Sequence, residues 1–280
     1  MENIIVGGDY MIPENMRNLL EEFEKISKMG WIRNTEKGKG SVGLNFERCL
    51  NKKPDSLFFP DYEGVEIKCT TRFSRFPISL FSVAFEGPTF PEINRIVDLY
   101  GYPDYEYPDK NVLKVDVKCG IKKKCGNFKF SLFYEDSNKR IYLDVYDLND
   151  HLIERKSYIS LDTFLSHIRL KLNYFALIKA SKKEVDEDVF YRYYHFYGYK
   201  LKSDEIIIDL LQKGIVFATL ESRVGKSSYN AGKYKNKNLV FKIKKEDLNK
   251  LFEEMCEVDE DYGINKLIEK NNQKNFYIMN

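Results

Sequence analysis

Residues 60–68 read Pro-Asp-Tyr-Glu-Gly-Val-Glu-Ile-Lys, and this run is the most informative in the chain. The alternation of apolar and charged residues after Gly64 predicts a β-strand. Side chains two positions apart in a strand point to the same face, so we expect Glu66 and Lys68 to lie together, with Asp61 just before them. Two carboxylates and an ammonium group therefore converge at this strand.

Such a cluster suits Mg²⁺-assisted hydrolysis of a phosphodiester. Carboxylate oxygens are the hard ligands that Mg²⁺ prefers, so Asp61 and Glu66 are the candidate metal ligands. An ammonium such as that of Lys68 can position a water or neutralise the charge that develops on phosphorus. Glu47 lies on a short helix predicted over residues 41–50, from which it can aim a third carboxylate at the same place.

The spacing alone is not specific. Asp109, followed by Asp116 and Lys118, has the same loose pattern, and either run can also be a strand with a solvated charged face. Position favours the first run, because the helix that carries Glu47 precedes it and an acid-free loop follows it. We therefore place the catalytic site at residues 61–68.

Elsewhere in the chain, periodicity predicts helices and strands in alternation. Apolar spacing predicts helices over residues 16–26, 161–175, 203–211 and 245–255, and β-rich runs predict strands at 65–71, 78–85, 112–119, 128–134, 141–146, 215–219 and 239–243. We expect residues 65–71 and 78–85 to pair, within a single sheet of five or six strands. Such a mixture of helices and strands indicates an α/β or α+β fold.

Composition limits the class of protein. The 280 residues carry 45 Lys+Arg against 43 Asp+Glu, a net charge of +2, and 43% are apolar, which fits one large domain or two small lobes. No stretch approaches the ~18 apolar residues of a membrane span, and the N-terminus lacks a secretion signal. The five cysteines include no Cys-x-x-Cys pair, so we interpret them as reduced thiols and expect a cytoplasmic protein.

Positive charge is segregated along the chain. Residues 222–245 contain eight cations and no acid, and Lys122 and Lys123 belong to a second basic cluster. A basic loop of this kind is typical of a nucleic-acid contact, although solubilising lysines on hairpin tips are the alternative interpretation. The candidate contacts in residues 222–245 are Arg223, Lys226, Tyr229, Lys233 and Lys235.

Two further loops flank the candidate catalytic residues. Lys39 and Ser41 precede the helix of Glu47, and a helix N-terminus preceded by a glycine-rich loop can accept a phosphate. After the strand of Lys68, four more candidates for DNA contact are Thr70, Arg72, Ser74 and Arg75.

The order and spacing of several runs resemble the MvaI/BcnI family of restriction endonucleases, whose catalytic core is related to that of the nickase MutH. The resemblance rests on Gly30-Trp31-Ile32, Gly40 to Glu47, Pro60 to Lys68 with Cys69 to Ser74, and Leu80-Phe81, and it continues more faintly to Phe252. By this resemblance the fold is a mixed central sheet flanked by helices, with a lobe for DNA recognition. Residues 1–158 would form the catalytic lobe and residues 159–280 would contribute recognition, unless the two are one continuous domain.

The resemblance also implies an activity. It makes Asp61 and Glu66 the Mg²⁺ ligands, Lys68 the catalytic lysine and Glu47 the supporting carboxylate. The implied enzyme is a type II site-specific deoxyribonuclease that leaves 5′-phosphate and 3′-hydroxyl ends. It would act on double-stranded DNA as a monomer, with a cognate methyltransferase in the same organism.

One departure concerns recognition. Members of the family place His-Gly-Thr before the Phe-Arg of a late strand, where this chain has residues 237–240 before Phe241-Lys242. The target sequence is therefore not transferable from known members. Two other functions stay open, a MutH-like nickase that cuts one strand and a DNA-binding module without catalysis.

Overall fold

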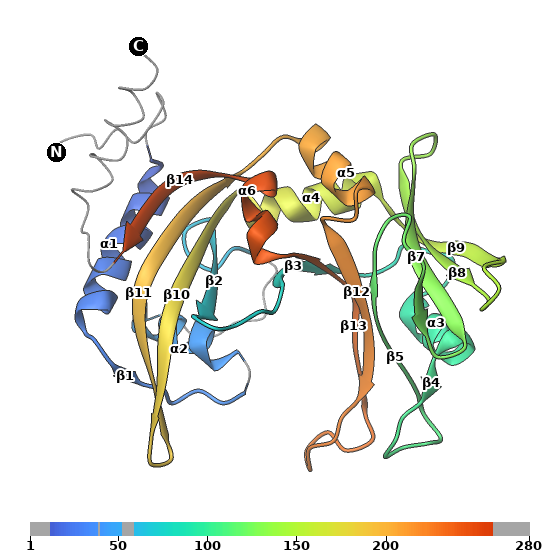
Figure 1. Ribbon diagram of the computed structural model, residues 1–280, viewed down its shortest axis with the longest axis horizontal. Coiled ribbons are helices and arrows are strands. Elements are labelled where there is room, and N and C mark those ends of the chain that lie inside the picture. The colour runs from blue at the N-terminus through green and yellow to red at the C-terminus, as the bar shows by residue number, and fades with distance from the viewer. Residues whose placement is uncertain (1–11, 39, 52–58, 260–280) are drawn as a thin grey trace. The chain divides into compact units, whose positions relative to one another are not determined.

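The computed structural model describes residues 12–38, 40–51 and 59–259. The chain divides into two units (Figure 1). Unit 1 contains the described residues up to Arg75, Leu170–Leu201 and those from Phe252 onward, whereas unit 2 contains Phe76–Arg169 and Lys202–Leu251. The division differs from the expected boundary at residue 158, because strands from both ends of the chain share the sheet of unit 1.

Unit 1 is a five-stranded sheet with two helices. The strands follow the order β1-β11-β10-β2, and β14 also pairs with β11. β2 runs parallel to β10, whereas the other pairs are antiparallel. The elements are α1 (Glu14–Lys28), β1 (Ile32–Arg33), α2 (Ser41–Cys49), β2 (Val65–Thr71), β10 (Tyr174–Val185), β11 (Asp188–Leu201) and β14 (Phe252–Asp259).

The core of unit 1 forms between α1 and the sheet. Met16, Leu19 and Phe23 recur at helical spacing and are buried, and the ring of Phe23 lies 5.4 Å from that of Phe196 on β11. Full burial of such a side chain stabilises the fold by about 1.5–3 kcal/mol. This core also receives Val65 and Ile67 of β2, which fixes the orientation of that strand.

Unit 2 contains two further sheets. One has the order β3-β13-β12-β5-β4 and the other the order β6-β7-β8-β9. The strands are β3 (Ile78–Val83), β4 (Tyr102–Pro103), β5 (Asn111–Val117), β6 (Lys123–Cys125), β7 (Phe128–Glu135), β8 (Arg140–Tyr146), β9 (Leu152–Ser160), β12 (Phe217–Val224) and β13 (Tyr234–Ile243). The helices are α3 (Glu92–Tyr100), α4 (Leu161–Leu172, whose last turn belongs to unit 1), α5 (Asp204–Gln212), the 3₁₀ turn Lys245–Asp247 and α6 (Leu248–Leu251).

Aromatic packing holds α4 against the first sheet of unit 2. Phe81 of β3 stacks on Phe241 of β13 with 5.2 Å between ring centroids, and Phe164 of α4 lies 4.8 Å from Phe241. All three side chains are buried. The apolar stripe predicted for this helix therefore does face a core.

Several expected elements differ from the structure. β2 and β3 do not pair with each other, since β2 pairs with β10 and β3 with β13. Three sheets replace the single sheet expected. The predicted helices 161–175 and 245–255 both end early, because the chain enters β10 and β14 respectively. Most of the basic stretch expected to be a loop forms the ends of β12 and β13.

Among the residues that the structure describes, no helix combines the length and the apolar character needed to cross a membrane.

Candidate active site

β2 carries the candidate catalytic residues on one face. Glu66, Lys68 and Thr70 alternate with Val65 and Ile67, which pack into the core of unit 1. Lys68 donates a hydrogen bond through Nζ to Oε1 of Glu66. The pairing expected from their spacing is therefore confirmed in the geometry of the strand.

A tight turn brings Asp61 to the same strand. The amide of Tyr62 donates to the carbonyl of Val65 at 3.0 Å, and the amide of Val65 donates back at 2.7 Å. Gly64 adopts a φ of 87° in this turn, a conformation that favours glycine. As a result, Oδ2 of Asp61 accepts a hydrogen bond of 3.0 Å from the amide of Ile67, between Glu66 and Lys68.

Glu66 is a fully buried carboxylate. Burial raises its pKa and the neighbouring charge of Asp61 raises it further, whereas the ammonium groups of Lys68 and Lys171 oppose the shift. The Nζ atom of Lys171 lies 3.1 Å from Oε2 of Glu66, an ion pair without hydrogen-bond geometry. Within the described residues, Oε2 has no hydrogen-bond partner.

This set of atoms fits a hard divalent cation. A buried carboxylate oxygen without a hydrogen bond is rare in folded proteins and calls for a ligand or a catalytic role. Asp61 and Glu66 supply the oxygen ligands that Mg²⁺ prefers, and Mg²⁺ commonly takes only one or two carboxylates, completing its shell with water and substrate phosphate. The described residues contain no cluster of three or more His, Cys, Asp or Glu side chains that could hold a metal alone.

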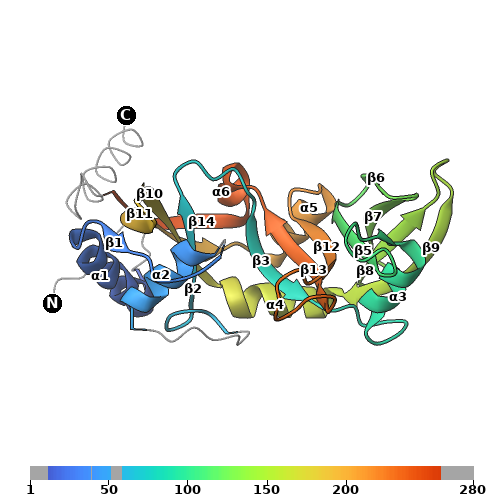
Figure 2. The ribbon, with the colours of Figure 1, turned by 90° about the horizontal axis from the view of Figure 1, so that it is seen from below.

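Glu47 lies near this strand on α2, which packs beside β2 (Figure 2). Burial raises the pKa of the Cys69 thiol well above its ordinary value, and the charge of Glu47 contributes to that shift. Cys69 packs on the core face of β2 with Val65 and Ile67, so α2 brings Glu47 to that side of the strand, opposite Glu66 and Lys68. A Cβ added at Gly43, one turn earlier in α2, would lie 4.0 Å from Oε1 of Glu47.

Lys171 is a site residue that the sequence analysis missed. It lies in the last turn of α4, three residues before β10, and the first residue of β10 pairs with Val65. Parallel pairing thus brings Lys171 next to Glu66 although the two are far apart in sequence. The parallel pairing of β2 with β10 was the missing information, because a lysine at the end of a helix carries no signal of its own.

The second acid-x-lysine run does not form such a site. Asp116 is exposed on β5 and accepts a hydrogen bond of 2.5 Å from the hydroxyl of Thr219. The ammonium of Lys118 lies 5.0 Å from the centre of the Phe217 ring. The two charges are therefore engaged with different neighbours.

The candidate DNA contacts after β2 lie in a turn. The amide of Arg72 donates to the carbonyl of Ala180, and its guanidinium lies 5.9 Å from the Phe73 ring. Arg72 and Arg75 are exposed, and Ser74 is partly exposed. Thr70 is buried, and its hydroxyl approaches the carbonyl of the next residue.

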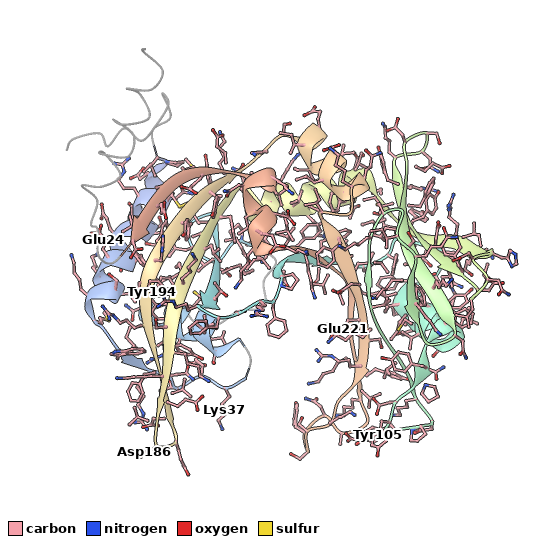
Figure 3. All side chains as sticks on the ribbon, in the orientation of Figure 1. Glu24, Lys37, Tyr105, Asp186, Tyr194 and Glu221 are labelled. Carbon is pink, nitrogen blue, oxygen red and sulfur yellow. The ribbon has the colours of Figure 1, made fainter. Side chains whose placement is uncertain are left out.

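The two candidates before α2 differ in status. Ser41 is buried, and its hydroxyl lies 2.8 Å from that of Tyr191 on β11, so it serves packing between α2 and the sheet. Lys39 lies outside the described residues. Lys37, which is labelled in Figure 3, is exposed in the same loop.

Acidic partners neutralise part of the basic stretch in unit 2. Nε of Arg223 lies 2.7 Å from Oε1 of Glu221 on β12 (Figure 3), and Lys226 pairs with Glu106 at 2.9 Å and Asp104 at 3.5 Å. These acids lie outside the acid-free run, which is why the sequence analysis counted the cations as free.

The remaining basic candidates are more exposed. Tyr229 is 82% exposed, with the ammonium of Lys233 5.7 Å from its ring centre, and Lys235 is exposed on β13. In the second cluster, Lys122 pairs with Asp150 at 3.6 Å, and Lys123 is exposed on β6.

Comparison with solved structures places this fold among restriction endonucleases. The structure of restriction endonuclease MvaI in complex with cognate DNA matches with a TM-score of 0.81 and 23% identity, over 88% of this chain and all of that one. MvaI in the absence of DNA matches with a TM-score of 0.55 and 20% identity, over 89% of this chain and 99% of that one. The expected fold class is thus confirmed.

The family is shown by the sequence itself. The model of the MvaI/BcnI restriction endonuclease family matches residues 20–252, and the chain belongs to this family. Comparison with curated proteins gives no match. The family identifies the protein as a restriction endonuclease, that is, a nuclease that binds DNA.

Proposed function

We propose that this protein is a type II restriction endonuclease that uses Mg²⁺ to hydrolyse phosphodiesters in double-stranded DNA, leaving 5′-phosphate and 3′-hydroxyl ends. The observation that carries the proposal is the buried carboxylate of Glu66, which lies on one strand face with Lys68 and beside Asp61. One of its oxygens receives no hydrogen bond from residues 12–38, 40–51 or 59–259. Family membership supplies the class of reaction.

The residues of unit 1 have separate roles in this reaction. Asp61 and Glu66 would hold Mg²⁺, which supplies Lewis-acid stabilisation of the phosphoryl oxygens. Lys68 is tied to Glu66, so its ammonium is oriented toward the place where charge develops. Glu47 supports this arrangement electrostatically from α2.

Unit 2 would supply recognition. Arg223 is the candidate reader with the most defined geometry, because Glu221 holds its guanidinium in place, and an oriented arginine suits a guanine edge in the major groove. Lys226, Tyr229, Lys233, Lys235, Lys122 and Lys123 would contact the DNA backbone, together with Arg72 and Arg75 of unit 1. We further propose a cytoplasmic monomer with a cognate methyltransferase in the same organism.

The test is cleavage of unmethylated phage DNA and supercoiled plasmid, with Mg²⁺ or with EDTA, followed by sequencing of the product ends. The proposal predicts discrete fragments that require Mg²⁺ and are absent with Lys68→Ala. Nicked circles alone would favour a MutH-like nickase. Intact DNA in a salt-sensitive complex would show a binding module without catalysis.

A further inference from the structure

Glu66 lies among charges of both signs. The neighbouring groups that act on this carboxylate include Asp61, Lys68 and Lys171. Lys68 takes Oε1 and Lys171 faces Oε2 at 3.1 Å. Both oxygens of the candidate ligand are thus approached by lysines.

The two lysines are not equivalent. Lys68 makes a hydrogen bond to Oε1, and its side chain is 30% exposed, so it reaches the face where a substrate would lie. Lys171 is 15% exposed and approaches an oxygen that receives no hydrogen bond within the described residues. Its contact with Glu66 is therefore electrostatic, at the oxygen that remains open to a further ligand.

We propose that Lys171 is a positioning residue that occupies the cation side of Glu66 and holds the metal site of the DNA-free protein at low affinity. This inference rests on the proposed metal site. A divalent cation that binds Oε2 would be repelled by the ammonium 3.1 Å from that oxygen, and this repulsion lowers its affinity. DNA phosphates add negative charge beside the site, which raises its affinity for the metal.

The size of the effect follows from Coulomb attraction. A charge within ~4–6 Å of a carboxylate changes its proton affinity by about 10- to 1,000-fold, and a divalent cation at the same oxygen is affected in the same direction. Removal of the Lys171 charge should therefore strengthen metal binding by at least about tenfold, or about 1.4 kcal/mol.

The experiment is titration of the purified, DNA-free protein with Mn²⁺ at mildly alkaline pH, with free Mn²⁺ followed by electron paramagnetic resonance. We expect Lys171→Met to bind Mn²⁺ at least about tenfold more tightly than wild type, and Lys171→Arg, which keeps the charge, to bind like wild type. A matched control is Lys182→Met. It removes the exposed Lys182–Glu184 ion pair on β10, the strand that follows Lys171, and should leave the affinity for Mn²⁺ unchanged.

Unchanged or weaker Mn²⁺ binding by folded Lys171→Met would overturn the inference. If circular dichroism shows that Lys171→Met does not fold, Lys171→Gln replaces the charge with a neutral amide. Its Mn²⁺ affinity is then compared with that of wild type in the same way. If the proposed metal site is wrong, Asp61→Ala will leave Mn²⁺ binding unchanged both alone and combined with Lys171→Met. That result is distinct from failure of the inference about Lys171.

Discussion

Each unit of this protein buries a glutamate among charged partners, but the two glutamates differ in their hydrogen bonds. In unit 2, Glu92 accepts from the amide of Thr89, from Nε of Arg95 at 2.9 Å and from the hydroxyl of Ser157 at 2.6 Å. In unit 1, Oε2 of Glu66 receives no hydrogen bond from the part of the chain that the structure describes.

The direction of the two pKa shifts reflects this difference. Burial alone would raise the pKa of Glu92, but hydrogen bonds from Arg95, Ser157 and Thr89 outweigh burial and lower it. For Glu66, burial outweighs the lysines and the pKa is raised. A buried charge with a complete set of partners stabilises the fold, whereas an incomplete set marks a place where a ligand binds.

The largest expected effect is on cleavage. Asp61→Ala and Lys68→Ala should each lower the rate by at least about 10²–10³-fold, because each removes a group that stabilises charge in the transition state. Binding of DNA should largely survive. Kinetics of plasmid cleavage and gel-shift binding measure the two separately, and the matched control is Asp116→Ala with Lys118→Ala, which should cleave like wild type.

Residual cleavage of comparable size in the Asp61 and control variants would refute the assignment of the site.

The second effect is on stability. Arg95 links Glu92 to Glu154, with Nη1 3.0 Å from Oε2 of Glu154, and is itself 22% exposed. Arg95→Ala leaves a buried carboxylate without its cation and should lower the free energy of unfolding by about 3–5 kcal/mol. Urea denaturation measures this. The exposed pair Arg169–Asp204 is the control, since Arg169→Ala should cost only about 0–1 kcal/mol.

If Arg95→Ala and Arg169→Ala lower the free energy of unfolding equally, the hydrogen bonds to Glu92 do not contribute to stability.

The third effect is on acid stability. Because the pKa of Glu92 and of Glu154 is lowered in the folded state, their ionised forms stabilise unit 2 at pH values above the ordinary glutamate pKa of 4.5. That contribution is lost as the pH falls below 4.5 through the folded-state values. Thermal melting as a function of pH should therefore show a steep acid limb, and Glu92→Gln should make it shallower. If Glu92→Gln leaves the acid limb of the melting curve unchanged, ionised Glu92 does not stabilise unit 2.

The smallest effect concerns an exposed cation. Lys123→Ala on β6 should leave stability within about 0.5 kcal/mol of wild type, because the side chain is exposed. If Lys123 contacts a phosphate, the slope of log K against log salt should become shallower by about 0.9. Fluorescence anisotropy with labelled duplex measures the slope, and an unchanged slope would remove Lys123 from the DNA interface.

Local sequence predicted the local parts of this molecule well. α1, α2 and β2 lie where periodicity placed them, and the side chains of Glu66 and Lys68 share a face because alternation in a strand requires it. Pairing between distant segments was not predictable in this way. The neighbour of β2 is β10 rather than β3, since register depends on packing that no single segment encodes.

The same limit applies to the candidate sites. Asp61 could be placed because it is five residues from Glu66, whereas Lys171 reaches Glu66 only through the parallel pairing of β2 with β10. The acids that pair with Lys226 likewise come from the segment between β4 and β5. Charge counted along the sequence therefore overstated how many cations in residues 222–245 are free for DNA.

The most direct test of the contrast compares Glu66→Gln with Glu92→Gln, by thermal melting without added metal and by plasmid cleavage with Mg²⁺. A group whose pKa is raised on folding contributes stability below its ordinary pKa and loses that contribution as pH rises through the folded value, so ionised Glu66 does not stabilise the fold at neutral pH. We predict that Glu66→Gln abolishes cleavage and melts at or above the wild-type temperature, whereas Glu92→Gln melts lower and still cleaves while folded. The opposite pattern, in which Glu66→Gln is the unstable variant and retains cleavage, would contradict the account.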